Sequence, residues 1–173
     1  MENAVVSESD VHDSLSGQFQ TGAQYLAFEL ADEHYVVDIL RVVEIRGWTP
    51  VTTIPNTPPF IKGVLNLRGR IVPVLDLRQR FGLEPRPYTE TTVVIVVSIE
   101  TDSGKKVIGM VVDAVSRVLN LGEQEIKESP DFGTAIHTEF IEGLATANEE
   151  MVMILNLDRM LTEHEVTNLN TVQ

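Results

Sequence analysis

The sequence predicts an all-β protein made of two small barrels packed side by side, with a short helix after the last hairpin of each. One observation is an internal repeat, because the segment that begins at Phe60 returns in weaker form from Phe140. Another is a series of strand-length runs rich in β-branched residues and separated by short polar turns. A third is that each repeated segment ends in a residue that caps helices well, Asp76 or Asn156. Short strands closed by sharp turns and one helical turn are typical of small barrels.

Comparing the two copies of the repeat distinguishes positions that both halves are expected to bury from positions that only one half is expected to use for binding. Aligning Phe60 with Phe140 also superposes Gly63 on Gly143 without a gap, and the neighbouring apolar positions match. The hairpin turn differs, because Arg-Gly-Arg in the first copy becomes Asn-Glu-Glu in the second. A loop that diverges while its core is kept indicates that only the first copy uses that loop for binding.

The elements are expected in a regular order. Strands are expected at residues 25–30, 35–37, 64–67, 70–75, 93–99 and 106–111. A tight turn near Arg68 and Gly69 joins two of them, with the glycine supplying a positive φ. Pro73 has no amide hydrogen, so its strand is expected at an edge or paired on one side only. Short helices are expected directly after Asp76 and Asn156.

Composition restricts the classes of function. The formal net charge of −13 disfavours binding to nucleic acid, whose phosphates it repels. The chain has no cysteine, which excludes disulfides and thiolate metal sites and fits a reducing compartment. Residues 1–20 are polar and acidic, without the apolar core of a signal peptide, and are expected to form a disordered tail. No apolar run reaches the roughly 20 residues of a membrane span. A cytoplasmic protein with no direct membrane insertion is therefore expected.

The sequence carries no recognisable catalytic or metal-binding motif. Its histidines are far apart and none has a second ligand at helical spacing, so neither a metal nor another cofactor is expected. A phosphate-binding glycine loop, a serine elbow and a cysteine nucleophile are all absent. A hydrolase that uses Asp38, Glu44 or Asp76 remains the rival hypothesis, although Asp76 is better explained as a helix cap.

Two features favour protein binding. Four prolines stiffen the segment from Pro50 to Pro59, which lowers the entropy lost on binding. Trp48 beside Arg46 fits an interface anchor as well as it fits a core plug, and both interpretations stay open. The basic residues gather between residues 41 and 86 in an otherwise acidic chain, and those near Arg68 favour a partner that carries carboxylates.

Three segments carry a resemblance to a known family. They read DILRVVEIRG at residues 38–47, NTPPFIKGVLNLRG at residues 56–69 and IVPVLDLR at residues 71–78. In this order and spacing they resemble the CheW family of bacterial chemotaxis coupling proteins. The resemblance runs from about Gln24 to Leu161 and includes VIGMVVDAV at residues 107–115.

The resemblance implies two pseudo-symmetric, five-stranded SH3-like barrels that share an apolar seam. The CheW-like domain is then expected at residues 21–163, with residues 24–88 as the first barrel, residues 89–163 as the second, and strand exchange between them left open. Residues 164–173 are expected to form a tail or a short helix.

The resemblance also implies a non-enzymatic adaptor that joins the cytoplasmic tip of chemoreceptors to the regulatory domain of the histidine kinase CheA. Further contacts with other copies of the coupler in a ring, and recruitment to membrane-bound receptor arrays, are part of the same expectation. A CheW-like module of a larger kinase or of a CheV-type coupler is the alternative, which the start at Met1 and the short tails disfavour.

Residues are carried over from the family position by position. The receptor's helical hairpin is expected to contact or be supported by Ile39, Val42, Val43, Glu44, Gly63, Asn66, Arg68 and Gly69. The kinase interface, which the resemblance defines less closely, is expected to include Arg46, Trp48, Lys62, Val112 and Arg117.

Overall fold

The computed structural model describes residues 22–128 and 138–170, so the tail expected at residues 1–20 lies outside the described residues. In chain order the strands are β1 (Ala23–Leu30), β2 (Glu33–Asp38), β3 (Val42–Gly47), β4 (Ile61–Leu67), β5 (Arg70–Asp76), β6 (Val93–Thr101), β7 (Gly104–Val112), β8 (Ala114–Leu121), β9 (Lys127–Glu128), β10 (Ile141–Ala147) and β11 (Glu150–Leu155). The helical elements are the 3-10 turns η1 (Ile39–Arg41), η2 (Glu123–Glu125), η4 (Thr138–Phe140) and η5 (Leu157–Arg159), and the α-helices α2 (Leu77–Arg80) and α3 (Glu163–Asn170). The predicted all-β class is confirmed, and α3 occupies most of the expected C-terminal segment.

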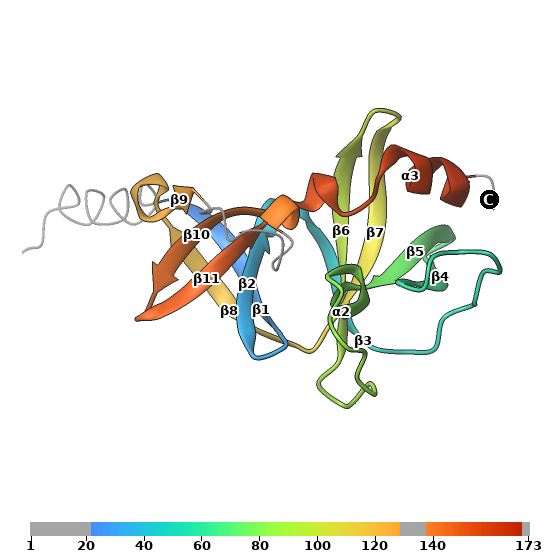
Figure 1. The fold of residues 1–173 in the computed structure, drawn as a ribbon, viewed down its shortest axis with the longest axis horizontal. Helices are drawn as coiled ribbons and strands as arrows, with labels where there is room; N and C mark the ends of the chain where they lie inside the picture. Colours follow the sequence, from blue (N-terminus) through green and yellow to red (C-terminus); the bar gives the residue numbers. More distant parts are fainter. Residues whose placement is uncertain (1–21, 129–137, 171–173) are drawn as a thin grey trace, which may run out of the picture.

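The strands form two curled sheets that lie side by side (Figure 1). One sheet has the strand order β8-β1-β2-β11-β10-β9, in which β9 has only two residues, and the other has the order β3-β6-β7-β5-β4. Neighbouring strands are antiparallel except for β2 with β11 and β5 with β7. Each sheet combines strands from both sides of residue 88, so a boundary between residues 24–88 and 89–163 does not separate the two barrels.

The repeat is visible as matched contacts in the two barrels. The Asp76 amide donates to the Phe60 carbonyl at 2.7 Å, and the Asn156 amide donates to the Phe140 carbonyl at 2.8 Å. The side chains of Asp76 and Asn156 accept backbone N–H groups of α2 and η5, which confirms both predicted caps. The Arg80 guanidinium lies over both phenylalanine rings, 4.5 Å from the centroid of Phe60 and 5.0 Å from that of Phe140. The two copies therefore meet at one cation–π contact.

Pro73 is paired on one side only, as predicted. It faces Val64 of β4 in an antiparallel register, whereas β5 pairs with β7 only from Val74 to Asp76. A residue without an amide hydrogen is tolerated there because no second ladder needs that donor.

The apolar core has three parts. Each curled sheet packs a small cluster against itself, with Val36 and Ile154 in one barrel and Val74 and Val96 in the other. The largest cluster takes side chains from both sheets and from α2, η5 and α3, and it includes the fully buried Phe28. This cluster is the shared apolar seam that the resemblance implied.

An ion pair between a buried arginine and a partly exposed aspartate links the two barrels where the chain passes from β7 to β8. Arg78 of α2, which is 5% exposed, forms an ion pair with Asp113, the single residue between those strands. The other sheet contributes the Ala31 amide, which donates to the Asp113 carboxylate at 3.0 Å. The carboxylate therefore contacts both barrels at once.

Acid is expected to weaken this link. Burial alone would raise the pKa of Asp113, but the hydrogen bonds from Arg78 and Ala31 and the Arg78 charge outweigh burial and lower that pKa below its ordinary value. The unfolded chain then binds the proton more readily, so the stability from the pair is complete above about pH 4 and is lost as the pH falls through the folded-state pKa. We expect the urea midpoint of the wild type to fall more steeply than that of Asp113→Asn between about pH 5 and about pH 2.5, so that the two curves converge in acid. Parallel curves would contradict the prediction.

Candidate protein-docking site

An apolar stripe lies exposed on η1 and β3. Leu40 is 88% exposed, Val43 is 54% exposed and Ile45 is 42% exposed. Ile39 and Val42 of the same segment are half-buried and pack against the core between the barrels. Because β3 ends the order of its sheet, the stripe lies along a strand edge that no neighbouring strand covers. Contiguous exposed apolar surface of this kind marks a protein interaction site.

Polar contacts hold the turn that presents Leu40. The Asp38 carboxylate accepts the Leu40 amide at 2.9 Å and so caps η1. Arg41 forms an ion pair with Asp158 of η5, and the same carboxylate accepts the Glu100 amide at 2.8 Å. An ordered turn loses little entropy when a partner covers it, so the exposed leucine is preorganised for binding.

Glu44 lies beside the stripe, on the other side of β3. It follows a β-bulge and sits opposite Val96, which is fully buried. One carboxylate oxygen, Oε2, is shielded from solvent and has no hydrogen-bond partner. Burying a polar atom without a hydrogen-bond partner costs free energy. The unpaired oxygen of Glu44 is therefore an unfavourable feature of the free protein at a position expected to bind the receptor.

The β4–β5 hairpin presents Arg68 at its tip. Arg68 has φ of 53° and Gly69 has φ of 87°, which confirms the predicted tight turn with positive φ. The Asn66 side chain braces the turn by accepting the Gly69 amide at 2.7 Å. Within residues 22–128 and 138–170 no hydrogen bond or ion pair joins the exposed Arg68 guanidinium to another residue. An arginine in a left-handed conformation is strained, and such strain is concentrated at functional positions.

The equivalent hairpin of the other barrel has a different tip. Asn148 and Glu149 take the two positive-φ positions of that turn. With its amide oriented so that the oxygen faces Arg117, Asn148 accepts hydrogen bonds from both terminal guanidinium nitrogens of Arg117, Nη1 and Nη2, each at 3.1 Å. The second tip is therefore tied to β8, whereas the first presents an unpaired cation. The difference between Arg-Gly-Arg and Asn-Glu-Glu in the sequence corresponds to this difference in contacts.

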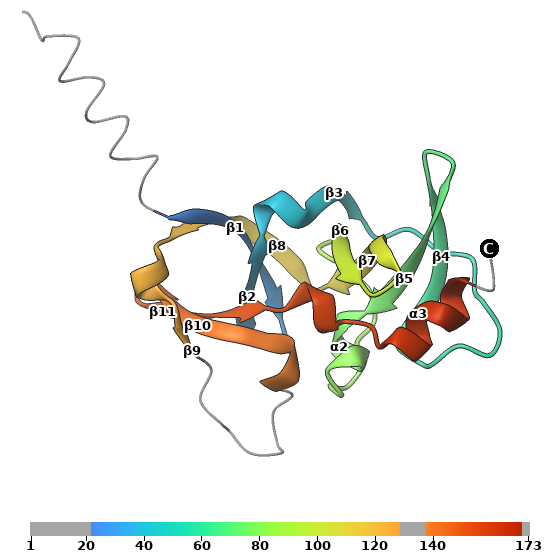
Figure 2. The same ribbon diagram turned by 90° about the horizontal axis from the view of Figure 1, so that it is seen from above.

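The residues expected to bind the receptor fall into two groups on the five-stranded barrel. Ile39, Val42, Val43 and Glu44 lie on η1 and β3, whereas Gly63, Asn66, Arg68 and Gly69 lie on β4 and its hairpin turn. The two strands end opposite sides of the sheet order, but the chain between them pairs Thr52 with Val64 and so closes the barrel. Figure 2 shows β3 and the tip of the β4–β5 hairpin on the same, upper side of the molecule. The strand that carries the first group and the turn that carries Arg68 and Gly69 thus lie on one side of the molecule.

The residues expected at the kinase interface do not form one cluster. Arg46, Trp48 and Lys62 lie on or beside the five-stranded sheet, whereas Arg117 lies on β8 of the other sheet. Val112 is 1% exposed inside the core between the barrels, so its side chain does not reach a partner, and that expectation is corrected. The last residues of β7 are buried on both faces, which leaves no exposed alternate position there.

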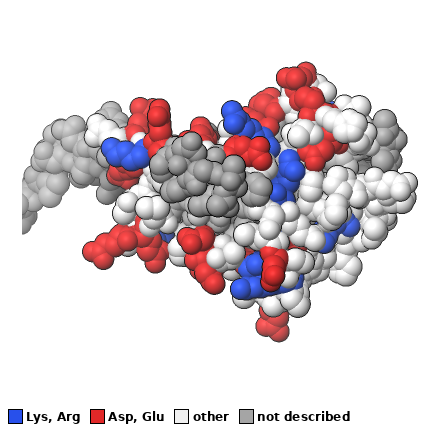
Figure 3. Space-filling view, in the orientation of Figure 1, with Lys and Arg blue, Asp and Glu red and all other residues white. Residues whose placement is uncertain are grey.

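Trp48 is both packed and accessible. Its ring lies 4.3 Å from that of Tyr88, centroid to centroid, and remains half-buried. The two rings line a shallow pocket of about 420 Å³ together with Lys62, Pro50 and Pro87. Residues 48–60 contain no charged side chain. Figure 3 shows few charges over β4, β5 and the segment that leads to β4, in contrast to the acidic surface over the six-stranded barrel. The pocket lining also includes Asp76 and Arg86, so the aromatic pair has charged neighbours, and aromatic residues with such neighbours are common in protein interfaces.

Two of the three carboxylates of the rival hydrolase hypothesis, those of Asp38 and Asp76, have structural partners. Asp38 caps η1, and Asp76 caps α2. The Tyr88 hydroxyl also donates to Asp76 at 2.6 Å, and burial together with this bond raises the pKa of Tyr88. No group of three or more acidic, histidine or cysteine side chains in the described part of the chain could hold a metal ion. No helix within the described residues is long and apolar enough to cross a bilayer.

Sequence reasoning missed part of the exposed stripe. Leu40 and Ile45 are more prominent on the surface than Ile39 and Val42, which were expected to bind but are half-buried. The signal available in the sequence was an apolar residue, Leu40, two positions after the helix-capping Asp38, together with an alternating pattern on β3. That pattern does not tell an edge strand from a central one.

Comparisons with known proteins agree with the geometry. A family model described as the CheW-like domain matches residues 24–165. A chemotaxis protein CheW from Klebsiella aerogenes is 44% identical over 151 residues, which cover 87% of this chain and 89% of the relative. Protein FrzA from Myxococcus xanthus is 29% identical, with 86% of this chain and 91% of the relative covered.

A solved structure matches the same region. The scaffolding protein TtCheW from Thermoanaerobacter tengcongensis superposes with a TM-score of 0.74 at 37% sequence identity, over 83% of this chain and 95% of that chain. The fold is shared with this solved structure, and the similarity to each of the three relatives covers more than four fifths of this chain. This chain therefore belongs to the CheW-like domain family.

Proposed function

We propose that this chain is a non-enzymatic chemotaxis scaffold that couples chemoreceptors to the histidine kinase CheA. The observation that carries the proposal is the exposed stripe of Leu40, Val43 and Ile45 on η1 and β3. Its strand β3 lies on the same side of the molecule as the tip of the β4–β5 hairpin, the turn that carries Arg68. The relatives support the role, because one is named a chemotaxis protein and another a scaffolding protein.

The receptor contact is proposed to be a helical hairpin laid along this side. An amphipathic helix buries its apolar face against such a stripe, which supplies most of the affinity. Arg68 then meets a receptor carboxylate in a charge-assisted hydrogen bond, which sets the register of the helix. Gly63, Asn66 and Gly69 act by shaping β4 and the turn that carries the arginine.

The kinase contact is proposed to use the surface around Trp48, with Arg46 and Lys62 beside it. Arg117 on the other barrel offers a second contact to a kinase or to another copy of the scaffold. Interfaces that are weak on their own suffice to hold the assembly together when receptors, kinases and scaffolds form a ring. Once one site is bound, the high effective concentration of the linked sites raises the overall affinity. The protein then works in the cytoplasm, recruited to membrane-bound receptor arrays through its partners.

Reconstitution tests the proposal. The chain is mixed with a receptor cytoplasmic hairpin fragment, with the CheA regulatory domain, and with both, and complexes are measured by calorimetry and size exclusion. We expect each partner to bind alone and all three proteins to elute together. Absence of binding to both partners up to roughly 100 μM would overturn the proposal, since coupling in an array still requires measurable single contacts.

Trp48 provides a direct test of the kinase surface, because it is the only tryptophan of the chain. Adding a CheA regulatory domain whose tryptophans are replaced by phenylalanine is expected to shift the Trp48 emission to shorter wavelength, since the half-buried ring loses water on docking. The receptor fragment is expected to leave the emission unchanged. A kinase complex that forms fully while the emission does not move would place the kinase elsewhere, and the Trp48→Phe variant supplies the blank.

A further inference from the structure

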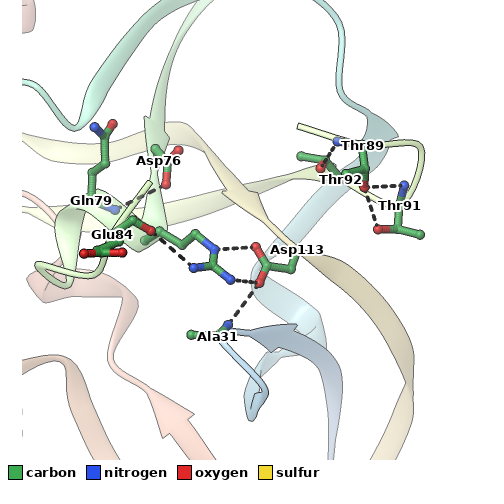
Figure 4. A network of polar contacts seen from close by, with 9 residues as sticks. Ala31, Asp76, Gln79, Glu84, Thr89, Thr91, Thr92 and Asp113 are labelled. Atoms are coloured by element: carbon green, nitrogen blue, oxygen red, sulfur yellow. Dashed lines mark hydrogen bonds and ion pairs between the residues drawn. The ribbon is translucent and has the colours of Figure 1, made fainter. Parts of the chain in front are cut away.

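Several hydrogen bonds around Arg78 and Asp113, and not a single contact, link the two barrels (Figure 4). The Arg78 guanidinium donates through Nε to one oxygen of Asp113 at 2.8 Å and through Nη2 to the other. Its third nitrogen, Nη1, donates to the Glu84 carbonyl at 3.3 Å. On the far side the Ala31 amide donates to Asp113, and the Asp113 amide donates to the Glu29 carbonyl at 3.1 Å. Both charged groups are thus bonded on two sides.

The location of the network matters because it joins parts that belong to different sheets. Arg78 lies in α2, directly after β5 of the five-stranded sheet. Glu29 lies at the end of β1 in the six-stranded sheet and Ala31 in the turn that follows it, and Asp113 is the residue where the chain crosses from one sheet to the other. A change in the angle between the barrels would separate these donors and acceptors.

Directional hydrogen bonds can fix the angle between the two barrels, which the apolar core between them cannot do alone. Hydrophobic burial is non-directional and depends on the buried area. Two apolar sheet faces therefore pack with similar free energy over a range of angles between the sheets. A two-point arginine–carboxylate contact has a defined plane and separation. Arg78 is buried whereas the Asp113 side chain is 32% exposed, and a pair of this kind contributes little net stability compared with apolar residues, so its role is better sought in specificity.

We propose that Arg78 and Asp113 are positioning residues that fix the orientation of the two barrels and thereby the shape of the docking face on η1 and β3. The face lies where the chain first crosses between the sheets, at η1, and Asp113 lies where it crosses back. Only the effect on docking rests on the proposed function; the orientation itself is a property of the free protein.

The orientation is measured on the free protein. The chain has no cysteine, so Met151→Cys on one barrel and Ser103→Cys on the other, both exposed, accept a pair of spin labels. We expect one narrow distance distribution in the otherwise wild-type protein and a broader or shifted one in Asp113→Asn. The double variant Arg78→Met with Asp113→Leu leaves no unpaired buried charge and is expected to stay folded, yet to show the same altered distribution. A wild-type distribution in the folded double variant would overturn the proposal.

Binding supplies the second readout. The double variant is expected to bind the receptor hairpin fragment at least tenfold more weakly, because Ile39 and Val42 of the docking face pack against the core between the barrels. Its affinity for the kinase domain is expected to change less than twofold, because the surface around Trp48 lies within the five-stranded barrel. Lys105→Gln removes an ion pair with Glu100 inside one β-hairpin and serves as the control that changes neither affinity. A double variant that binds the receptor fragment as tightly as the wild type would overturn the effect on docking. A wild type that binds no receptor fragment would refute the proposed function instead, with the distance measurement still deciding the orientation.

Discussion

Arg68→Glu is expected to abolish receptor binding and leave the fold intact. The side chain is exposed at a hairpin tip and has no partner in the described part of the chain, so its replacement removes no folding contact. Reversing the charge replaces an attraction to the receptor carboxylate by a repulsion, which costs several kcal/mol at an interface. We expect at least a ~100-fold loss of affinity, about 2.7 kcal/mol, by calorimetry with the receptor fragment. An unchanged circular dichroism spectrum must accompany the loss.

Two further variants separate recognition from charge and from strain. Arg70→Glu changes the next exposed cation of the same hairpin and is expected to weaken binding by only a few fold, as screened long-range charge does. Arg68→Gly suits the positive φ of 53° and is expected to stabilise the fold by up to ~1 kcal/mol while receptor binding falls. If Arg68→Gly bound the receptor as the wild type does, the arginine would have no part in recognition.

Gly63→Ala is expected to lower the free energy of unfolding far more than Gly47→Ala, which adds the same methyl group to β3. A Cβ at this position would lie 2.1 Å from the Thr52 carbonyl oxygen, and the backbone has φ of +150°. The clash falls where Thr52 and Val64 exchange two backbone hydrogen bonds of 3.0 and 2.8 Å that close the barrel. Backbone strain of ~1–3 kcal/mol and two weakened bonds of ~1 kcal/mol each predict a loss of about 4 kcal/mol in the free energy of unfolding.

Urea unfolding with a matched substitution checks this loss. Gly47→Ala adds the same methyl group to β3, where no atom lies within 4 Å of the new Cβ. It is expected to change the free energy of unfolding by less than ~0.5 kcal/mol. Equal effects of the two substitutions would show that the close approach of β4 to Thr52 does not matter for stability. Receptor binding by residual folded Gly63→Ala is expected to fall as well, because the displaced strand carries Asn66 and Arg68.

The candidate site was predictable only in part. The turn at Arg68 and Gly69 was predicted correctly because a glycine after a short strand favours a positive-φ hairpin turn whatever surrounds it. Trp48 could not be assigned from the sequence, since a tryptophan beside a proline-rich segment suits a core or an interface equally. The structure shows that it packs on Tyr88, 40 residues later in the sequence, and still lines an open pocket. Val112 was misplaced because a family position does not show that the end of β7 is buried on both faces.

Residues close together in the sequence determine the individual strands, turns and helix caps, whereas pairing between distant segments determines how these elements combine. The caps at Asp76 and Asn156, the hairpin turns and the repeat are readable along the chain, because each depends on residues a few positions apart. The exchange of strands between the halves, the exposed edge of β3 and the Arg78–Asp113 link exist only once segments far apart meet. Similar alternating strands offer several pairings of nearly equal local merit, and only burial of both sheets against one shared core selects among them.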